Sequence, residues 1–187
     1  MINGKLADQK ATINVSSIDS LNNKKLAIAA TLQKEHENYR LTIDPDTFFM
    51  MNKQWQLSND NAVVFGKAGF MIHHFVMNNA QSEISAASVN DKFNDDIKAE
   101  IKNFKLEDVS RIIEKDTSLV AGTLDGTILL KRVNNAYGII SDISIKQLAI
   151  RKVPVGDLTL KADNPTTEKF SINLALSGNG NNINAKG

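Results

Sequence analysis

Hydrophobic and polar residues alternate with a period of two along much of the chain. Every second residue is apolar in the segments 25–32, 97–102, 157–162 and 171–176. Successive side chains of a strand point to opposite faces, so each of these segments has one apolar face and one polar face. This pattern is typical of antiparallel strands with one side in water. The chain is therefore predicted to be all-β.

Polar segments rich in Asn, Asp, Ser and Gly separate the strands at fairly even intervals. The segments predicted to form hairpin loops are 20–24, 34–38, 58–61, 162–168 and 177–181. No linker or low-complexity stretch forces a domain boundary, so residues 1–187 are predicted to form a single β-rich domain. Because the alternation continues to the last residues, we interpret the chain as a fragment of a longer repetitive β protein.

One segment has the period of a helix instead. Leu106, Val109, Ile112 and Ile113 are spaced so that they share one helical face. This spacing predicts a short helix near residues 106–114. A helix of about two to three turns is marginal in water by itself, so we expect it to pack against the strands.

Three segments shift the strand alternation by one residue. In 70–77, 99–106 and 143–150, two polar residues stand where one is expected between apolar positions. In a regular strand this shift would move the following apolar residues to the opposite face. A β-bulge adds one residue and keeps the apolar side chains on one face, and it bends and twists the strand. We therefore expect a bulge in each segment.

Bulges combined with glycines at strand starts are the devices that curve a sheet. The glycines that precede an x-apolar pair are Gly4, Gly122, Gly126, Gly138 and Gly156. They favour a sheet that curls towards its own apolar face, an open half-pipe with an apolar interior. The alternative is a closed β-sandwich or barrel whose apolar faces form its core, which would serve as a binding or adhesin-like module at the cell surface.

Composition and charge exclude several other functions. Lys and Arg number 22 against 21 Asp and Glu, and this balance argues against nucleic-acid binding. Cysteine is absent, which excludes disulfides and thiol nucleophiles. The N-terminus lacks the pattern of a signal peptide, and no run of about 20 apolar residues is present.

No set of residues suggests catalysis, a metal or a cofactor. His36 lies in a polar turn, and His73 and His74 are strand neighbours whose side chains should point to opposite faces unless a bulge relaxes this rule. The acidic segment 90–96 lacks the glycine and terminal glutamate of a calcium-binding loop. Trp55 is interpreted as a core anchor. We therefore expect a protein that is not an enzyme.

Four segments, in a fixed order, carry a resemblance to a known family. They are I-K-A-E-I-K-N-F-K-L-E-D-V-S-R-I-I-E-K (97–115), L-V-A-G-T-L-D-G-T-I-L-L (119–130), Y-G-I-I-S-D-I-S-I-K-Q-L (137–148) and V-G-D-L-T-L-K-A (155–162). Their order and spacing resemble the C-terminal domain of the TamB family, the translocation and assembly module of AsmA-like proteins in double-membraned bacteria. The upstream segment 41–61 is similar to a companion segment of some members.

The resemblance implies a β-taco, a long sheet folded lengthwise into a half-pipe. It implies a periplasmic protein that bridges the inner and outer membranes and takes part in phospholipid transport and outer-membrane protein assembly. By the same resemblance, the parent protein is anchored in the inner membrane and meets an outer-membrane barrel of the BamA superfamily. Neither the anchor nor a docking element for the barrel is recognisable in these residues.

The strand pattern and the resemblance point to one site, an apolar wall that shields the acyl chains of phospholipids. Exposing about 15 methylenes to water costs roughly 12 kcal/mol. Outward positions such as Lys102, Ser144, Thr159 and Asn173 should face water. Strands at the edges should also support edge-to-edge self-association. The residues expected to line the apolar face are Phe70, Ile72, Ile84, Ala99, Ile101, Ile128, Leu130, Ile143, Ile145, Leu158, Leu160, Ile172 and Leu174.

Overall fold

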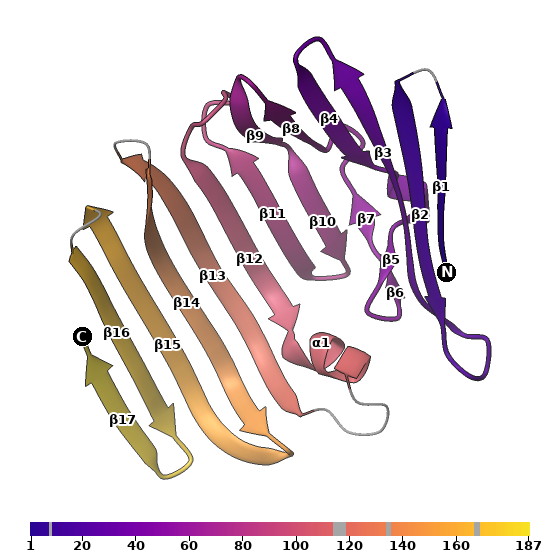
Figure 1. The fold of residues 1–187 in the computed structure, drawn as a ribbon. Helices are drawn as coiled ribbons and strands as arrows, with labels where there is room; N and C mark the ends of the chain where they lie inside the picture. Colours follow the sequence, from indigo (N-terminus) through magenta and orange to yellow (C-terminus); the bar gives the residue numbers. More distant parts are fainter. Residues whose placement is uncertain (8, 114–118, 134–135, 167–168) are drawn as a thin grey trace. The chain divides into compact units, whose positions relative to one another are not determined.

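The computed structural model describes residues 1–7, 9–113, 119–133, 136–166 and 169–187. Within these residues the chain forms two antiparallel sheets, one short α-helix and one turn of 3-10 helix (Figure 1). Neither sheet is closed or strongly curled. The predicted all-β class with a short helix is confirmed at this level.

The described chain divides into two compact units, where the sequence predicted a single domain. Unit 1 comprises Met1–Ala80 and Ser85–Asp95, and unit 2 comprises Gln81–Ile84 and Asp96–Gly187. The strand β11 (Ser82–Ser88) contributes to both. Each unit is described by itself below.

Unit 1 is built on an antiparallel sheet with the strand order β1-β2-β3-β4-β8-β9. Short strands accompany it, and β7 pairs with β10. The strands of this sheet are β1 (Ile2–Ala7), β2 (Lys10–Ile18), β3 (Lys24–Glu35), β4 (Asn38–Ile43), β8 (Ala62–Gly66) and β9 (Gly69–His73). The shorter elements are η1 (Pro45–Thr47), β5 (Phe49–Met50), β6 (Lys53–Gln54), β7 (Gln56–Leu57) and β10 (Phe75–Asn79).

The core of unit 1 forms around Trp55, whose side chain is completely buried. Its indole N–H donates to the carbonyl of Met50 at 3.0 Å, which satisfies the one polar atom of the ring. Buried Asn61 accepts from the N–H of Ile43 at 2.9 Å and donates to the carbonyl of Ser58 at 2.7 Å. The predicted role of Trp55 as a core anchor is confirmed. The other buried apolar residues of the unit are Phe48, Leu57, Ala62, Val64 and Met77.

In unit 2, consecutive strands pair antiparallel in the order of the sequence, from β12 to β17. The strands are β12 (Ile97–Lys105), β13 (Val120–Val133), β14 (Ala136–Ile150), β15 (Val153–Thr166), β16 (Lys169–Gly178) and β17 (Asn181–Lys186). Most predicted hairpin loops coincide with the observed turns. The loop predicted at 162–168 is too long, because β15 continues to Thr166 and only 167–168, outside the described residues, separate it from β16.

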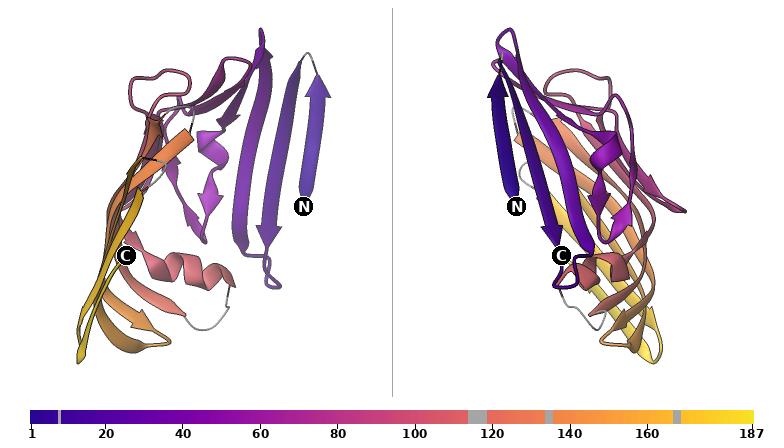
Figure 2. Two further views of the ribbon diagram at one scale, coloured as in Figure 1. Left: turned by 60° about the vertical axis from the view of Figure 1, so that its left-hand side comes forward. Right: turned by 90° about the vertical axis from the view of Figure 1, so that its right-hand side faces the viewer.

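The predicted helix is confirmed as α1 (Leu106–Ile113), which follows β12 directly. Residue 114 of the predicted range lies outside the described residues. Figure 2 shows α1 projecting to one side of the unit 2 sheet. The helix contacts β13, and Glu107 accepts a hydrogen bond from the backbone N–H of Gly122 at 3.4 Å. The expectation that the helix packs against the strands is therefore also confirmed.

Two of the three predicted bulges occur. The register shifts between Ile101 and Phe104 on β12 and between Ile145 and Leu148 on β14. In both cases the second of the two polar residues has a left-handed backbone, with φ of 49° at Asn103 and 54° at Gln147. Single residues in this conformation are a recognised way to insert one residue into a strand.

An aspartate on the next strand holds each bulge. The backbone N–H of Asn103 donates to Asp125 on β13 at 2.8 Å, and that of Gln147 donates to Asp157 on β15 at 2.7 Å. The inserted residue has lost its ladder partner, so the carboxylate satisfies a donor that would otherwise lack a protein acceptor. Each bulge is therefore accompanied by an aspartate on the next strand that accepts a hydrogen bond from its backbone N–H group.

The third predicted bulge is wrong. At His74, with φ of 39°, the strand ends, so that β9 and β10 are separate elements. β9 pairs with β8, whereas β10 pairs with β7 in the other sheet. The same one-residue slip that makes a bulge in unit 2 here transfers the chain from one sheet to the other.

The left-handed bulge residue predicts opposite effects of glycine at two adjacent positions. Gln147→Gly should leave the free energy of unfolding unchanged or raise it by up to about 1 kcal/mol, because glycine adopts positive φ without steric cost. Lys146→Gly should lower it by about 0.5–1 kcal/mol, because Lys146 pairs with Thr123 on β13 and has no positive φ that glycine would relieve. Urea unfolding of the whole chain measures both. Equal destabilisation by the two variants would contradict the bulge assignment.

Candidate functional site

Cross-strand register places the predicted lining residues of unit 2 on one face. Ile101 opposes Gly126, Gly126 opposes Ile143, Ile143 opposes Leu160, and Leu160 opposes Leu174. Side chains of directly opposed residues lie on the same face of a sheet. These five residues therefore form one row that crosses five strands.

Parallel rows extend this face along the strands. One runs from Ala99 through Ile128 and Ser141 to Ala162 and Ile172. Another runs from Leu124 through Ile145, Leu158 and Leu176 to Ile183. The predicted lining residues that share the face are Ala99, Ile101, Ile128, Leu130, Ile143, Ile145, Leu158, Leu160, Ile172 and Leu174.

The two bulges extend the apolar face past the point where the alternation breaks. Beyond the first, Phe104 opposes Leu124, which belongs to the same face. Beyond the second, Leu148 opposes Gly156, two residues before Leu158. Gly156 has φ of 127°, and a Cβ atom there would clash with the carbonyl of Ser177. Both bulges therefore keep the apolar residues on one face, as predicted, whereas the strong curl expected of the sheet is not observed.

The opposite face of unit 2 is polar and carries ion pairs. Lys102 binds Glu83 at 2.8 Å, and Lys161 binds Asp142 at 2.8 Å. The hydrogen bond with Glu83 raises the pKa of Lys102. Ser144, Thr159 and Asn173 lie on this face too, as predicted, and the apolar pair Leu129–Ile140 is an exception to its polar character.

The apolar face of unit 2 is only partly removed from solvent. Ile97, Phe104 and Leu148 are buried, whereas most of the other residues on the face are half-buried. Ile172 and Ile183 are 37% and 52% exposed. The described residues of unit 2 form one sheet and one helix, so no second sheet of that unit covers the face.

Unit 1 has a comparable face that the sequence analysis recognised only in part. Its register places Leu32, Leu41, Val63 and the predicted Ile72 in one row across four strands. Phe70, also predicted, lies on the same face two residues earlier in β9. The last predicted residue, Ile84, belongs to unit 2 and is half-buried within β11. The alternation in β4 was the signal that could have identified Leu41, whereas β8 is apolar at the consecutive positions 62–65 and gives no such signal.

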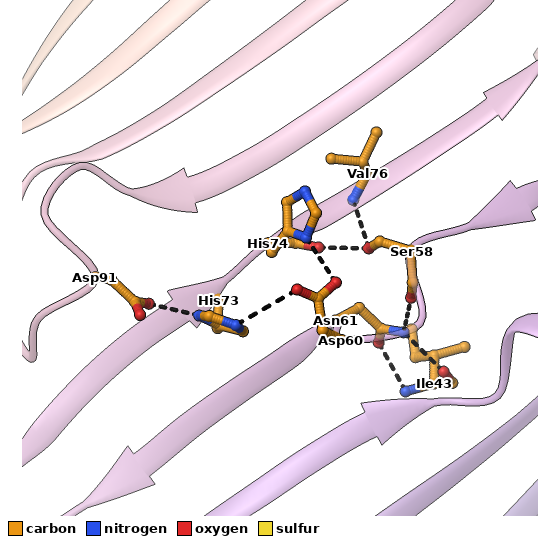
Figure 3. A network of polar contacts seen from close by, with 8 residues as sticks. All are labelled: Ile43, Ser58, Asp60, Asn61, His73, His74, Val76 and Asp91. Atoms are coloured by element: carbon orange, nitrogen blue, oxygen red, sulfur yellow. Dashed lines mark hydrogen bonds and ion pairs between the residues drawn. The ribbon is translucent and has the colours of Figure 1, made fainter.

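A polar cluster lies where β9 ends (Figure 3). The Nδ1 atom of His74 is 2.6 Å from a carboxylate oxygen of Asp60, and that of His73 is 2.6 Å from Asp91. His73 Nε2 also lies 3.8 Å from Asp60, so both histidines approach one carboxylate. The hydrogen bond with His74 holds the pKa of Asp60 below its ordinary value. The expectation that the histidines point apart is wrong, because the left-handed His74 interrupts the strand geometry.

This cluster secures the change of sheet. Ser58 accepts from the N–H of Val76 at 3.2 Å and donates to the carbonyl of His74 (Figure 3). In the described part of the chain, no group of three or more His, Cys, Asp or Glu side chains could hold a metal ion. The hydrogen bonds of His73 to Asp91 and of His74 to Asp60 give the histidines a structural role where the chain changes sheet.

A depression of about 480 Å³ in unit 2 is lined mainly by polar-face residues such as Asp142, Lys161 and Asn173, and Ile172 of the apolar face contributes to its lining. The acidic segment 90–96 forms a loop in which Asp95 accepts from both the backbone and the side chain of Asn90, at 3.0 and 2.8 Å. None of the helices in the described residues is long and apolar enough to cross a membrane. The extended apolar faces, which carry the predicted lining residues, are the candidate site.

Comparison of the chain with protein-family models, curated proteins and solved structures found no match. The resemblance to the TamB family accordingly depends on the segments quoted above, and what it implies about function is a proposal.

The free strand edges predict self-association. In the described chain, β1 and β17 stand at the ends of their strand orders. An edge strand presents unpaired N–H and C=O groups that can pair with another chain. We expect sedimentation velocity to show dimers or larger species at high concentration. Ile183→Lys, which adds a charge to β17, should reduce this association, and a strict monomer across a wide concentration range would contradict the prediction.

Proposed function

We propose that this protein is a periplasmic lipid-conduit segment of a TamB-like protein that bridges the inner and outer membranes. In this role it takes part in phospholipid transport and outer-membrane protein assembly. The observation that carries the proposal is the apolar face of unit 2, which crosses six strands, extends past two bulges and is largely half-buried.

The dimensions of the face suit an acyl chain. Neighbouring strands lie about 4.8 Å apart, so a row across six strands spans about 24 Å. One leaflet of a bilayer is about 15 Å thick in its hydrocarbon region, half of the whole core. A single row is therefore long enough to lie along a whole acyl chain and to offset part of the roughly 12 kcal/mol cost of its exposure to water.

The chemistry of the face also suits lipid passage. Contacts between aliphatic side chains and hydrocarbon are not directional, so an acyl chain can slide from one row to the next without breaking a specific bond. The polar face, with ion pairs such as Lys161–Asp142, keeps the other side of the same strands in water. The pattern accordingly supports transport without catalysis or cofactors.

We extend the proposal to the parent protein. Bulges and glycines curve sheets, so a longer run of such strands would form an open half-pipe, the β-taco of the TamB family. Anchoring in the inner membrane and contact with a barrel of the BamA superfamily follow from the resemblance alone. The alternative, a closed β-sandwich binding module, would bury these faces permanently as a core.

Ile145 and Ser144 provide a matched test. Ile145→Asp should leave the domain folded, because a half-buried charge remains accessible to water and avoids the several kcal/mol of a fully buried one. The same variant in the full-length parent should fail to support outer-membrane integrity, because a passing acyl chain loses its shielding beside the charge. Ser144→Asp, on the polar face, should change neither the folding of the domain nor outer-membrane integrity.

Photo-crosslinking gives a direct readout of the same pair. A photoreactive residue at position 145 should capture phospholipid, and one at position 144 should not. Equal labelling at the two positions would favour the closed sandwich. Global unfolding of the Ile145→Asp variant, detected by circular dichroism, would favour it too.

A further inference from the structure

Unit 1 carries a row of three exposed aromatic side chains at one end of its apolar face. Tyr39 on β4 opposes Phe65 on β8, which opposes Phe70 on β9. The rings of Tyr39 and Phe65 stack with their centroids 5.8 Å apart. The exposed fractions are 41%, 37% and 37%, which is high for aromatic residues placed side by side.

The row marks a boundary between two environments. Along the strands in one direction the same face continues in aliphatic residues, of which Leu41, Val63 and Ile72 are the nearest row. In the other direction the strands end in polar hairpin turns, where Lys67 pairs with Glu37 at 2.9 Å. The aromatic side chains therefore separate an aliphatic surface from a charged rim.

A lysine, Lys34, lies beside the aromatic row. Lys34 on β3 opposes Tyr39, so its exposed side chain lies on the same face. A lysine stem can follow an apolar surface while its ammonium group reaches a phosphate in water. The row thus offers an ammonium and a phenolic hydroxyl beside two phenyl rings.

We propose that Lys34, Tyr39, Phe65 and Phe70 form the subsite for the head group of a bound glycerophospholipid. The acyl chains of this lipid lie on the aliphatic rows, the glycerol esters contact the rings, and the phosphate meets Lys34 and the hydroxyl of Tyr39. Tyrosine and other amphipathic aromatic residues occupy this level of a membrane, between hydrocarbon and head groups. This inference rests on the proposed function, because it assumes that the apolar faces bind lipid.

The test uses the full chain and two photoreactive phosphatidylglycerols, one activated in the head group and one at the end of an acyl chain. Both carry short chains and are kept below their critical micelle concentration, so that single lipids are the probe. The head-group probe should label the row, and the acyl-chain probe should label the aliphatic rows of unit 1 and position 145. Glycerol 3-phosphate, which has the phosphate without the chains, should not compete.

Matched variants test the individual contacts. Phe65→Ser and Lys34→Gln should each reduce labelling of the row by the head-group probe about fivefold. Lys10→Gln is the control, because Lys10 opposes Gln33 and therefore lies on the other face. The emission of the buried Trp55 verifies in each variant that unit 1 is folded.

The outcomes separate the two proposals. If the acyl-chain probe labels position 145 but the head-group probe shows no preference for the aromatic row, the head-group subsite is overturned. The proposed function is then unaffected. Absence of acyl-chain labelling at every position overturns the proposed function itself. Competition by glycerol 3-phosphate overturns the lipid subsite in favour of a simple phosphate site. Labelling of the row only in phosphatidylglycerol vesicles overturns it in favour of contact with a bilayer surface.

Discussion

The period of two in a β-strand is the constraint on which the rest of this structure depends. Because one inserted residue exchanges the two faces of a strand, an apolar face that crosses several strands survives only if every insertion is compensated. On β12 and β14 the compensation is a single left-handed residue, at Asn103 and Gln147. Asp125 and Asp157 then satisfy the backbone N–H groups that the insertions release.

The same slip has two structural outcomes, and the neighbouring strands decide between them. In unit 2 a neighbouring strand pairs on both sides of each bulge, β13 along β12 and β15 along β14, so the bulged strand stays in its sheet. At His74 of unit 1, β8 ends its pairing with His73, and the chain turns to pair with β7 instead. The side chains of Ser58 and Asp60 then take over hydrogen bonds at the break.

Much of the fold of unit 2 could be predicted, because alternation is a local property. It assigned Ile145 to the apolar face and Ser144 to the polar face, and the register agrees. The break at His74 could not be predicted, because the spacing within a strand does not reveal its partners. The aromatic row was missed for a related reason, since Tyr39 and Phe65 become neighbours only when β4 pairs with β8.

The strand order of unit 2 has a consequence for how such a protein can change its length. From β12 to β17 every strand pairs with its neighbours in sequence, so each hairpin interacts mainly with the next, as in a linear array of repeats. Cooperativity in such an array passes from neighbour to neighbour, and folding can begin at any hairpin and spread. Duplication of one hairpin would lengthen the sheet and leave the pairing elsewhere intact, so evolution could adjust the reach of the chain in increments of two strands.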